Sequence, residues 1–219
     1  MQVRIEQPEI SGDTVIFRWE QSEPNRFQIE NSFFLRYENL DLAAFSPELL
    51  YEVFLSYQLR VFAAYGHPVT IQFPSPVPAY TVAFWSAYHN AGDVTITPVA
   101  DRGGYDPWAG SPALMEQPRS KAVFFGGGKD STLAICLLSE IYGPDEVLVV
   151  QFVGPIRNDP KLGRYLEERQ EQLMLAPVRE KLGVATQRVF TNYQAIFRRD
   201  AEHVRPHLEL YTAGSLPAL

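Results

Sequence analysis

The residues best suited to chemistry lie together in one stretch, KAVFFGGGKDSTLAICLLSE, which runs from Lys121 to Glu140. A short apolar run predicts a strand over 122–125, and apolar residues recur at helical spacing after Ser131. Between these two elements stand Gly126, Gly127, Gly128, Lys129 and Asp130. The glycines let the backbone turn sharply and approach a ligand closely. A loop of this kind points backbone N–H groups and a helix N-terminus at one place, which suits a phosphate or pyrophosphate.

Two well-known phosphate loops do not fit this stretch. A Walker A loop has a glycine five residues before Gly-Lys-Ser/Thr, but that position is Val123, and Lys129 is followed by Asp130. A dinucleotide-binding fingerprint has the pattern Gly-x-Gly-x-x-Gly, and its third glycine would fall on Ser131. The loop therefore belongs to neither class.

The sequence Gly-Gly-Gly-Lys-Asp-Ser, residues 126–131, resembles the Ser-Gly-Gly-x-Asp-Ser signature of the PP-loop ATP pyrophosphatase superfamily. The resemblance implies an enzyme that cleaves ATP between its α and β phosphates, passes AMP to a substrate and releases pyrophosphate. Gly126 stands where the family usually has serine. This difference removes one hydroxyl contact to pyrophosphate and leaves the backbone contacts in place.

The resemblance also implies roles for individual residues, with ATP and Mg²⁺ as the cofactors. Lys129, Asp130 and Ser131 are the expected catalytic residues, and Asp130 is expected to hold Mg²⁺ directly or through water. In a parallel sheet, ligands lie at the carboxyl ends of the strands. The expected nucleotide-binding residues are Gly126, Gly127, Gly128, Lys129 and Ser131 in the loop, with Gln151, Phe152 and Asn192 at the strand ends.

Strands and helices alternate after the loop. The single cysteine, Cys136, lies within the apolar helix, and we expect it to pack in the core without forming a disulfide. The further elements expected are a strand over 146–153 buried on both faces, a long helix over 161–182 kinked at Pro177, a strand over 186–190 and a last helix over 193–210. This order predicts a parallel sheet with right-handed crossovers.

The front of the chain predicts a small β-rich α+β domain over 1–100. We expect a hairpin over 3–20, a strand over 27–37, a helix from Ser46-Pro47 to Gly66, a strand over 69–73 ended by Pro74, Pro76 and Pro78, a helix over 80–88 and a strand over 94–99. Residues 101–120 are rich in glycine and proline and are interpreted as a linker. The fold class is therefore α/β, with a parallel-sheet, Rossmann-like PP-loop domain over 121–219.

Composition sets limits on function. The 219 residues are 46% hydrophobic and 21% charged, which is ordinary for a soluble chain. A net charge of −7 disfavours a broad nucleic-acid surface. Because the chain opens without a basic and apolar leader and has no apolar run that could span a bilayer, we expect a cytoplasmic protein with no membrane partner.

The wider layout, with a β-rich front portion, a linker and the loop, is also similar to the ATP-dependent epimerase type of peptidoglycan synthesis. That type inverts the terminal glutamate of UDP-N-acetylmuramoyl-L-alanyl-L-glutamate. The resemblance implies an isomerase in which adenylation of a small-molecule carboxylate makes the neighbouring Cα–H acidic enough for a general base to remove. His203 and His207 are spaced as metal ligands could be, but the interpretation favoured for both is an exposed surface position.

Other readings of the loop stay open. PP-loop domains continue with further strands, whereas this chain stops at Leu219. We therefore expect association, either as a homo-oligomer or with a partner chain that completes the domain. The alternatives are a nucleotide-binding subunit of a split PP-loop enzyme, or a PP-loop tRNA or small-molecule ligase. Thiolating members that use Cys-x-x-Cys are excluded, because the chain has one cysteine.

Overall fold

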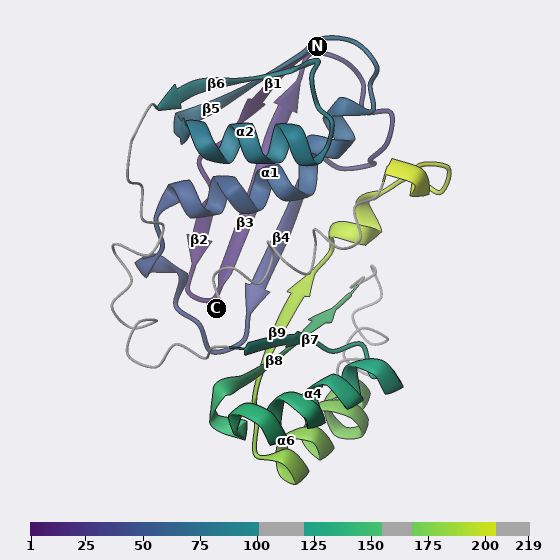
Figure 1. The fold of residues 1–219 in the computed structure, drawn as a ribbon. Coiled ribbons are helices and arrows are strands. Elements are labelled where there is room, and N and C mark those ends of the chain that lie inside the picture. Colours follow the sequence, from purple (N-terminus) through teal and green to yellow (C-terminus); the bar gives the residue numbers. More distant parts are fainter. Residues whose placement is uncertain (101–120, 155–167, 205–219) are drawn as a thin grey trace.

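The computed structural model describes residues 1–100, 121–154 and 168–204. Its strands are β1 (Gln2–Ile5), β2 (Glu9–Ser11), β3 (Thr14–Gln21), β4 (Ser32–Tyr37), β5 (Val69–Pro78), β6 (Val94–Ala100), β7 (Lys121–Phe124), β8 (Val147–Val153) and β9 (Ala185–Thr191). Its main helices are α1 (Pro47–Ala63), α2 (Ala79–Tyr88), α4 (Lys129–Tyr142) and α6 (Ala176–Leu182). Within these residues, one mixed sheet has the strand order β6-β5-β1-β3-β4-β9-β8-β7, and β2 pairs with β3 (Figure 1). The α/β class expected from the sequence is confirmed.

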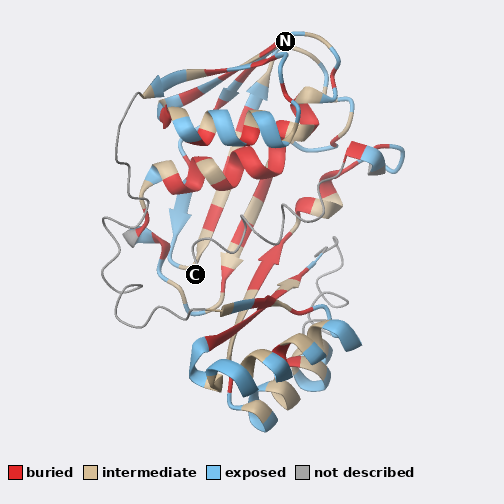
Figure 2. Ribbon diagram, viewed as in Figure 1, coloured by how far each residue is buried: buried red, intermediate tan, exposed pale blue. Residues whose placement is uncertain are grey.

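The front of the sheet begins with the predicted hairpin. Strands β2 and β3 are antiparallel, with Ser11 opposite Thr14. The turn uses Gly12 at φ 59°, in the left-handed region that favours glycine. Alternate residues of β3 are buried, including Phe17 and Trp19, because one face of the sheet packs against α1 (Figure 2).

The sequence predicts that the strand beginning at Val69 ends at Phe73, before the first of three prolines. This prediction is wrong. Strand β5 continues through all three prolines to Pro78 and pairs in parallel with β6. The register between these strands shifts between Gln72 and Val77. Prolines are tolerated at such an irregularity, because their missing N–H groups are not needed in the ladder there.

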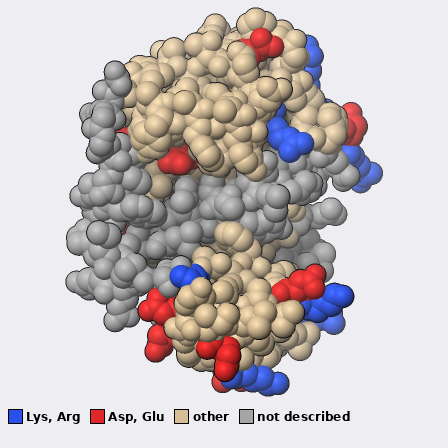
Figure 3. Space-filling view, in the orientation of Figure 1, with Lys and Arg blue, Asp and Glu red and all other residues tan. Residues whose placement is uncertain are grey.

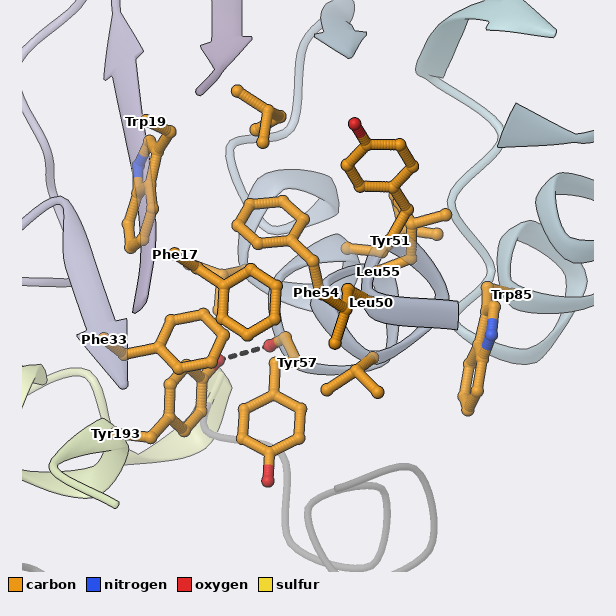
Figure 4. Packing of buried hydrophobic residues seen from close by; sticks show 14 of the residues in the cluster. Phe17, Trp19, Phe33, Leu50, Tyr51, Phe54, Leu55, Tyr57, Trp85 and Tyr193 are labelled. Atoms are coloured by element: carbon orange, nitrogen blue, oxygen red, sulfur yellow. Dashed lines mark hydrogen bonds between the residues drawn. The ribbon is translucent and has the colours of Figure 1, made fainter. Parts of the chain in front are cut away.

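Helix α1 forms where its sequence signals predict. Ser46 is the N-cap, and its Oγ accepts a hydrogen bond of 3.3 Å from the N–H of Leu49. Beneath the helix, the Phe33 and Tyr57 rings stack at 5.2 Å, and the Tyr193 hydroxyl donates to the Tyr57 carbonyl (Figure 4). Tyr193 follows β9, so this aromatic core contains residues from both ends of the described chain.

The second half of the sheet is parallel, as predicted. Strand β7 pairs in parallel with β8, and β8 pairs in parallel with β9. Helices α4 and α6 cover the same face of these strands (Figure 1), because successive right-handed crossovers in one direction place their helices on one side. The expected burial of β8 on both faces is confirmed by Val147, Leu148, Val149 and Val150, which are at most 8% exposed.

Strands β4 and β9 join the two halves. They are antiparallel, with Leu35 opposite Thr191 and Tyr37 opposite Val189. The larger hydrophobic core consequently runs from the front sheet to Leu148 and Val150 of β8. The predicted linker over 101–120 lies outside the described residues, and the domain boundaries stay a prediction.

The predicted last helix is wrong over 193–204. This segment forms short 3₁₀ turns at Tyr193–Ile196 and Glu202–Val204, and the rest of the prediction lies outside the described residues. Pairing with the front of the chain replaces helical hydrogen bonds: the N–H of Ile29 donates to the Ile196 carbonyl at 2.7 Å, and the N–H of Arg198 donates to the Phe27 carbonyl at 2.8 Å. Tertiary pairing has overridden local helix propensity.

The helix expected over 161–182 is helical from residue 168 to residue 182, and its earlier part lies outside the described residues. A π-turn at Glu171–Leu175 directly precedes α6, in which Pro177 stands near the first position. Proline lacks an N–H group and clashes with the carbonyl four residues earlier. The wider π-turn relieves this conflict and is the observed form of the predicted irregularity at Pro177.

The predicted core position of Cys136 is also wrong, because its thiol is exposed. Helix α4 touches the sheet through Ile135, which is fully buried, and through the partly buried Ala134 and Leu138. Cys136 follows Ile135 by about 100° around the helix and therefore points away from the sheet.

An ion pair at the β4–β9 junction generates a prediction. Arg188 donates two hydrogen bonds to Glu38, one of them from Nε to Oε2 at 2.9 Å. This hydrogen bonding is the main reason that the pKa of Glu38 is lowered. We expect Arg188→Met to reduce the free energy of unfolding at pH 7 by about 1 kcal/mol, a value discounted because Glu38 is partly exposed.

Urea unfolding of wild type and Arg188→Met at several pH values checks this expectation. A carboxyl group with a lowered folded-state pKa contributes stability above its unfolded pKa of about 4.3 and loses that contribution as pH falls through the folded pKa. The difference between the two proteins should therefore shrink below about pH 4. Arg18→Met, which breaks an exposed pair with Glu9, is the matched control and should reduce the free energy of unfolding by less. If both variants lost the same free energy of unfolding, the stabilising role given to the Arg188–Glu38 pair would be wrong.

Candidate functional site

The glycine loop connects β7 to α4 as the sequence predicts. Strand β7 ends at Phe124 and α4 begins at Lys129. The Phe125 side chain is buried, and its N–H donates to the Val150 carbonyl at 2.9 Å, which fixes the start of the loop against β8. Residues 126–130 are exposed. The sheet thus holds the loop at the carboxyl end of a parallel strand, with its backbone open to solvent.

The N-terminus of α4 leaves its N–H groups available. Gly128 is the N-cap, with an extended backbone and no side-chain cap. The side chains of Ser131 and Thr132 instead donate to the Gly128 carbonyl, at 3.0 and 2.9 Å. The first N–H groups of a helix have no partner within the helix, and the helix dipole places partial positive charge there. An anion that reached this exposed end would therefore be stabilised.

The three expected catalytic residues occupy the first turn of α4. Lys129 and Asp130 are exposed, whereas Ser131 is partly buried and bonded to Gly128. No cluster of three or more metal-ligating side chains occurs in the part of the chain that the structure describes. A Mg²⁺ ion at Asp130 would therefore take most of its oxygen ligands from phosphates and water, which is how Mg²⁺ commonly binds.

Gly127 has two separate constraints. Its φ of 77° lies in the left-handed region, and a Cβ at this position would stand 1.7 Å from Cε of Met174. Met174 belongs to the π-turn before α6. The second crossover connection therefore packs directly against the glycine loop, a contact for which the sequence offers no signal.

Gln151 is the predicted strand-end residue with the most informative surroundings. It is 2% exposed, and its Oε1 atom has no hydrogen-bond partner among the residues that the structure describes. It lies on the same side of β8 as Val149 and Val153, which is the side that faces α4 and α6. Buried polar atoms are nearly always satisfied, and an unpaired one costs about 1–3 kcal/mol. An unpaired amide oxygen here favours a bound donor, either water or a ligand.

The other two strand-end predictions have different surroundings. Phe152 faces the opposite side of β8 and packs against the larger core. Asn192 accepts a hydrogen bond of 3.0 Å from the N–H of Phe34, and so helps to join β9 to β4. Of the three residues, the structure brings only Gln151 to the side of the sheet that bears α4.

A charged network beside the loop was not predicted from the sequence. Glu171, in the π-turn that carries Met174, lies 2.8 Å from Arg179 and 3.6 Å from Arg188. Arg188 also binds Glu38 and is the register partner of Gln151. No local pattern in the sequence indicates this network, because Arg188 lies in the middle of β9 and its partners Glu38 and Glu171 are distant in sequence.

Two other features lie apart from the loop. His203 is exposed on a 3₁₀ turn, with its ring 6.3 Å from that of Phe27, and His207 lies outside the described residues. A cavity of about 460 Å³ lies on the front sheet, where Arg4, Glu6 and Glu20 are among its lining residues. Its lining includes no residue of the glycine loop.

Comparisons with protein-family models, with curated proteins and with solved structures find no match to this chain. The functional argument therefore rests on the residues and geometry described above. In the described part of the chain, no helix combines the length and apolar character needed to cross a membrane.

The geometry of Gly127 gives a prediction about the loop. We expect Gly127→Ala to reduce the free energy of unfolding by about 1–2 kcal/mol, because an L-residue is strained at this φ and the Met174 side chain must move. For a chain of this length, that loss lowers Tm by about 2–4 °C per kcal/mol.

Thermal unfolding measures the change, with Gly126→Ala as the matched control. A Cβ at Gly126 has open space around it, so this variant should melt close to wild type. When Met174→Ala is added to Gly127→Ala, the protein should regain only the share of the lost stability that the clash with Met174 causes. Equal melting of Gly126→Ala and Gly127→Ala would show that the left-handed conformation of Gly127 is not required.

Proposed function

We propose that this chain is an adenylating enzyme of the PP-loop ATP pyrophosphatase type, which cleaves ATP to AMP and pyrophosphate to activate a substrate carboxylate. The observation that carries the proposal is the exposed Gly-Gly-Gly-Lys-Asp-Ser loop between a parallel strand and an uncapped helix N-terminus. Nearby, the unpaired Oε1 of Gln151 offers a buried acceptor on the same side of the sheet as α4.

In this proposal the chain acts mainly by binding and orienting phosphates. Backbone N–H groups of Gly127, Gly128 and Lys129 donate to the β and γ phosphates, and the Lys129 ammonium group offsets their charge. The Ser131 hydroxyl, now bonded to Gly128, can rotate to donate to a phosphate oxygen. Asp130 would hold Mg²⁺, which supplies Lewis-acid stabilisation of the phosphate charge when bound.

The reaction itself is a group transfer. A carboxylate oxygen of the substrate forms a bond to the α-phosphorus of ATP while the bond from that phosphorus to the α–β bridging oxygen breaks. Pyrophosphate leaves with the electron pair, and the substrate becomes an acyl adenylate. Fixed donors that neutralise charge as it develops on the leaving group are the main way in which such a site accelerates phosphoryl chemistry.

The specific substrate class proposed is the terminal glutamate of a UDP-muramoyl-dipeptide, inverted after adenylation. Support for this class comes from the order of a β-rich front portion before the glycine loop. Adenylation acidifies the Cα–H of that glutamate, and a general base must remove the proton. A second candidate is a nucleotide-binding subunit of a split PP-loop enzyme. This candidate is favoured by the observation that the described part of the parallel sheet holds only β7, β8 and β9.

The first test identifies the products of ATP. We expect Mg-ATP incubated with the protein and the UDP-muramoyl-dipeptide to yield AMP and pyrophosphate, which chromatography of the spent nucleotide separates from ADP and phosphate. Because the bond broken defines the mechanism, ADP with phosphate would refute the proposed chemistry. Isotope exchange between pyrophosphate and ATP, dependent on the carboxylate substrate, would show formation of the adenylate.

The second test concerns Asp130. We expect Asp130→Asn to lower AMP release by at least 100-fold without unfolding the protein, because an amide cannot neutralise Mg²⁺ as a carboxylate does. A helix-terminal role alone would change stability by about 1 kcal/mol and leave turnover intact. Glu140→Gln, at the other end of the same helix, is the matched control and should keep full activity. Full specific activity in Asp130→Asn would remove this residue from the site.

A further inference from the structure

The cavity of about 460 Å³ on the front sheet lies where two parallel strands separate. Strand β1 pairs with β5 as far as Arg4 and Gln72, and the register of β5 with β6 shifts directly after Gln72. Pro74, which has no N–H group to pair, lines the cavity just past this point. Irregular strand pairing is common beside functional sites, because it opens the sheet and redirects side chains.

The chain leaves these two strands in opposite directions. From β1 it runs to β2 and β3 on one side, and from β5 it runs through α2 to β6 on the other side (Figure 1). In open sheets, the crevice at the carboxyl ends of two such parallel strands is the usual place for a ligand. The cavity volume also falls within the range of ligand pockets, about 300–1,000 Å³. Its position and its size therefore both indicate a binding site.

The polar side chains of the cavity lie on the sheet face opposite to α1. Arg4, Glu20 and Gln72 are exposed, whereas the residue before each of them is buried in the core beneath α1. Side chains alternate between the two faces of a strand. In the space-filling view, the surface over α1 and α2 carries few charged side chains (Figures 1 and 3). The two faces of the front sheet thus differ in character, and the cavity belongs to the charged one.

One cation stands beside two carboxylates in this cavity. Arg4 lies directly opposite Glu20 in the antiparallel pair of β1 and β3, and Glu6 follows Arg4 by two residues along β1. Directly opposite residues have Cβ atoms about 4.5–5.5 Å apart. Among the ion pairs of the described residues, none joins Arg4 to Glu6 or Glu20. Both signs of charge are therefore available to one small ligand.

A buried tyrosine holds another polar group of the lining in place. The Tyr51 hydroxyl donates to Oε1 of Gln7 at 3.3 Å and accepts from the Ser75 hydroxyl at 3.0 Å. Tyr51 is buried in the core, so this contact fixes the Gln7 side chain. Because the amide oxygen of Gln7 accepts this bond, its amide nitrogen is the group that remains to donate to a ligand.

We propose that this cavity binds a free α-amino acid with a polar side chain. The planar guanidinium group of Arg4 binds the α-carboxylate through two parallel hydrogen bonds, and Glu20 accepts from the α-ammonium group. One carbon atom joins the two charged groups of an α-amino acid, which matches opposite charges on directly facing residues of neighbouring strands. The amides of Gln7 and Gln72 favour a polar ligand side chain. The argument uses the front sheet alone, so it goes beyond the proposed nucleotide chemistry and does not depend on it.

The first measurement identifies the ligand. Thermal unfolding of the full chain, without nucleotide, is followed with each of the standard L-amino acids at about 10 mM, well above a Kd of about 1 mM. We expect at least one polar amino acid to raise Tm by about 2 °C or more, because a ligand that binds only the folded chain stabilises it. If none of them raises Tm, the proposal is wrong.

Analogues of that amino acid test both charged contacts by calorimetric titration. Its N-acetyl derivative lacks the cation, and its α-amide lacks the anion. Each should bind at least 10-fold more weakly than the free amino acid, because each has lost a charge-assisted hydrogen bond. Equal binding of the α-amide would show a site for cations alone and would overturn the proposal.

Variants of the lining assign the binding to this cavity. Arg4→Gln and Glu20→Gln should each weaken binding at least 10-fold. Arg18→Gln is the matched control and should bind as wild type does, because Arg18 lies on the same face of β3 as Glu20 but does not line the cavity. Circular dichroism melts confirm that each variant is folded before titration. Wild-type affinity in Arg4→Gln would place the amino acid elsewhere and refute the assignment.

Discussion

The pairing of β4 with β9 is the interaction on which the rest of the structure depends. It is the only antiparallel contact between the front strands and the parallel strands within the described residues. Side chains reinforce it, because Asn192 accepts from the Phe34 N–H and Thr191 donates to the Phe34 carbonyl. Since this pair supplies a neighbour for β9, the parallel strands need no open edge on that side.

The position of the glycine loop follows from this constraint. With β9 fixed by β4, the two crossover connections run from β7 through α4 to β8 and from β8 through α6 to β9, and both helices lie on one face (Figure 1). The π-turn before α6 then brings Met174 against Gly127, and Glu171 against Arg188. Arg188 also binds Glu38, so a line of contacts runs from the end of β4 to the loop. The geometry of the candidate site therefore includes groups from both halves of the chain.

The sequence was sufficient for elements with strong local signals. The hairpin around Gly12, the Ser46 cap and the strand–loop–helix around Gly126–Ser131 have distinct turn or capping chemistry, and each was predicted correctly. The predictions that failed concern residues whose structure depends on contacts with parts of the chain that are distant in sequence. The segment 193–204 pairs with residues 27–29 in place of forming a helix, and Cys136 faces outward because α4 contacts the sheet through Ile135. Likewise, no local pattern could place Met174 beside Gly127 or leave the Gln151 oxygen unpaired.

Strand β8 lies between two hydrophobic cores and contributes side chains to both, one core on each face. Leu148 and Val150 face the larger core, while Val147 and Val149 face the smaller one beneath α4. If either core opens, one face of β8 loses its packing. The free energies of opening the two cores are therefore coupled. The backbone amides of β8 should therefore exchange with solvent only when both regions open, as in global unfolding. Damage under α4 would consequently weaken the aromatic core beneath α1, because both cores pack against this strand.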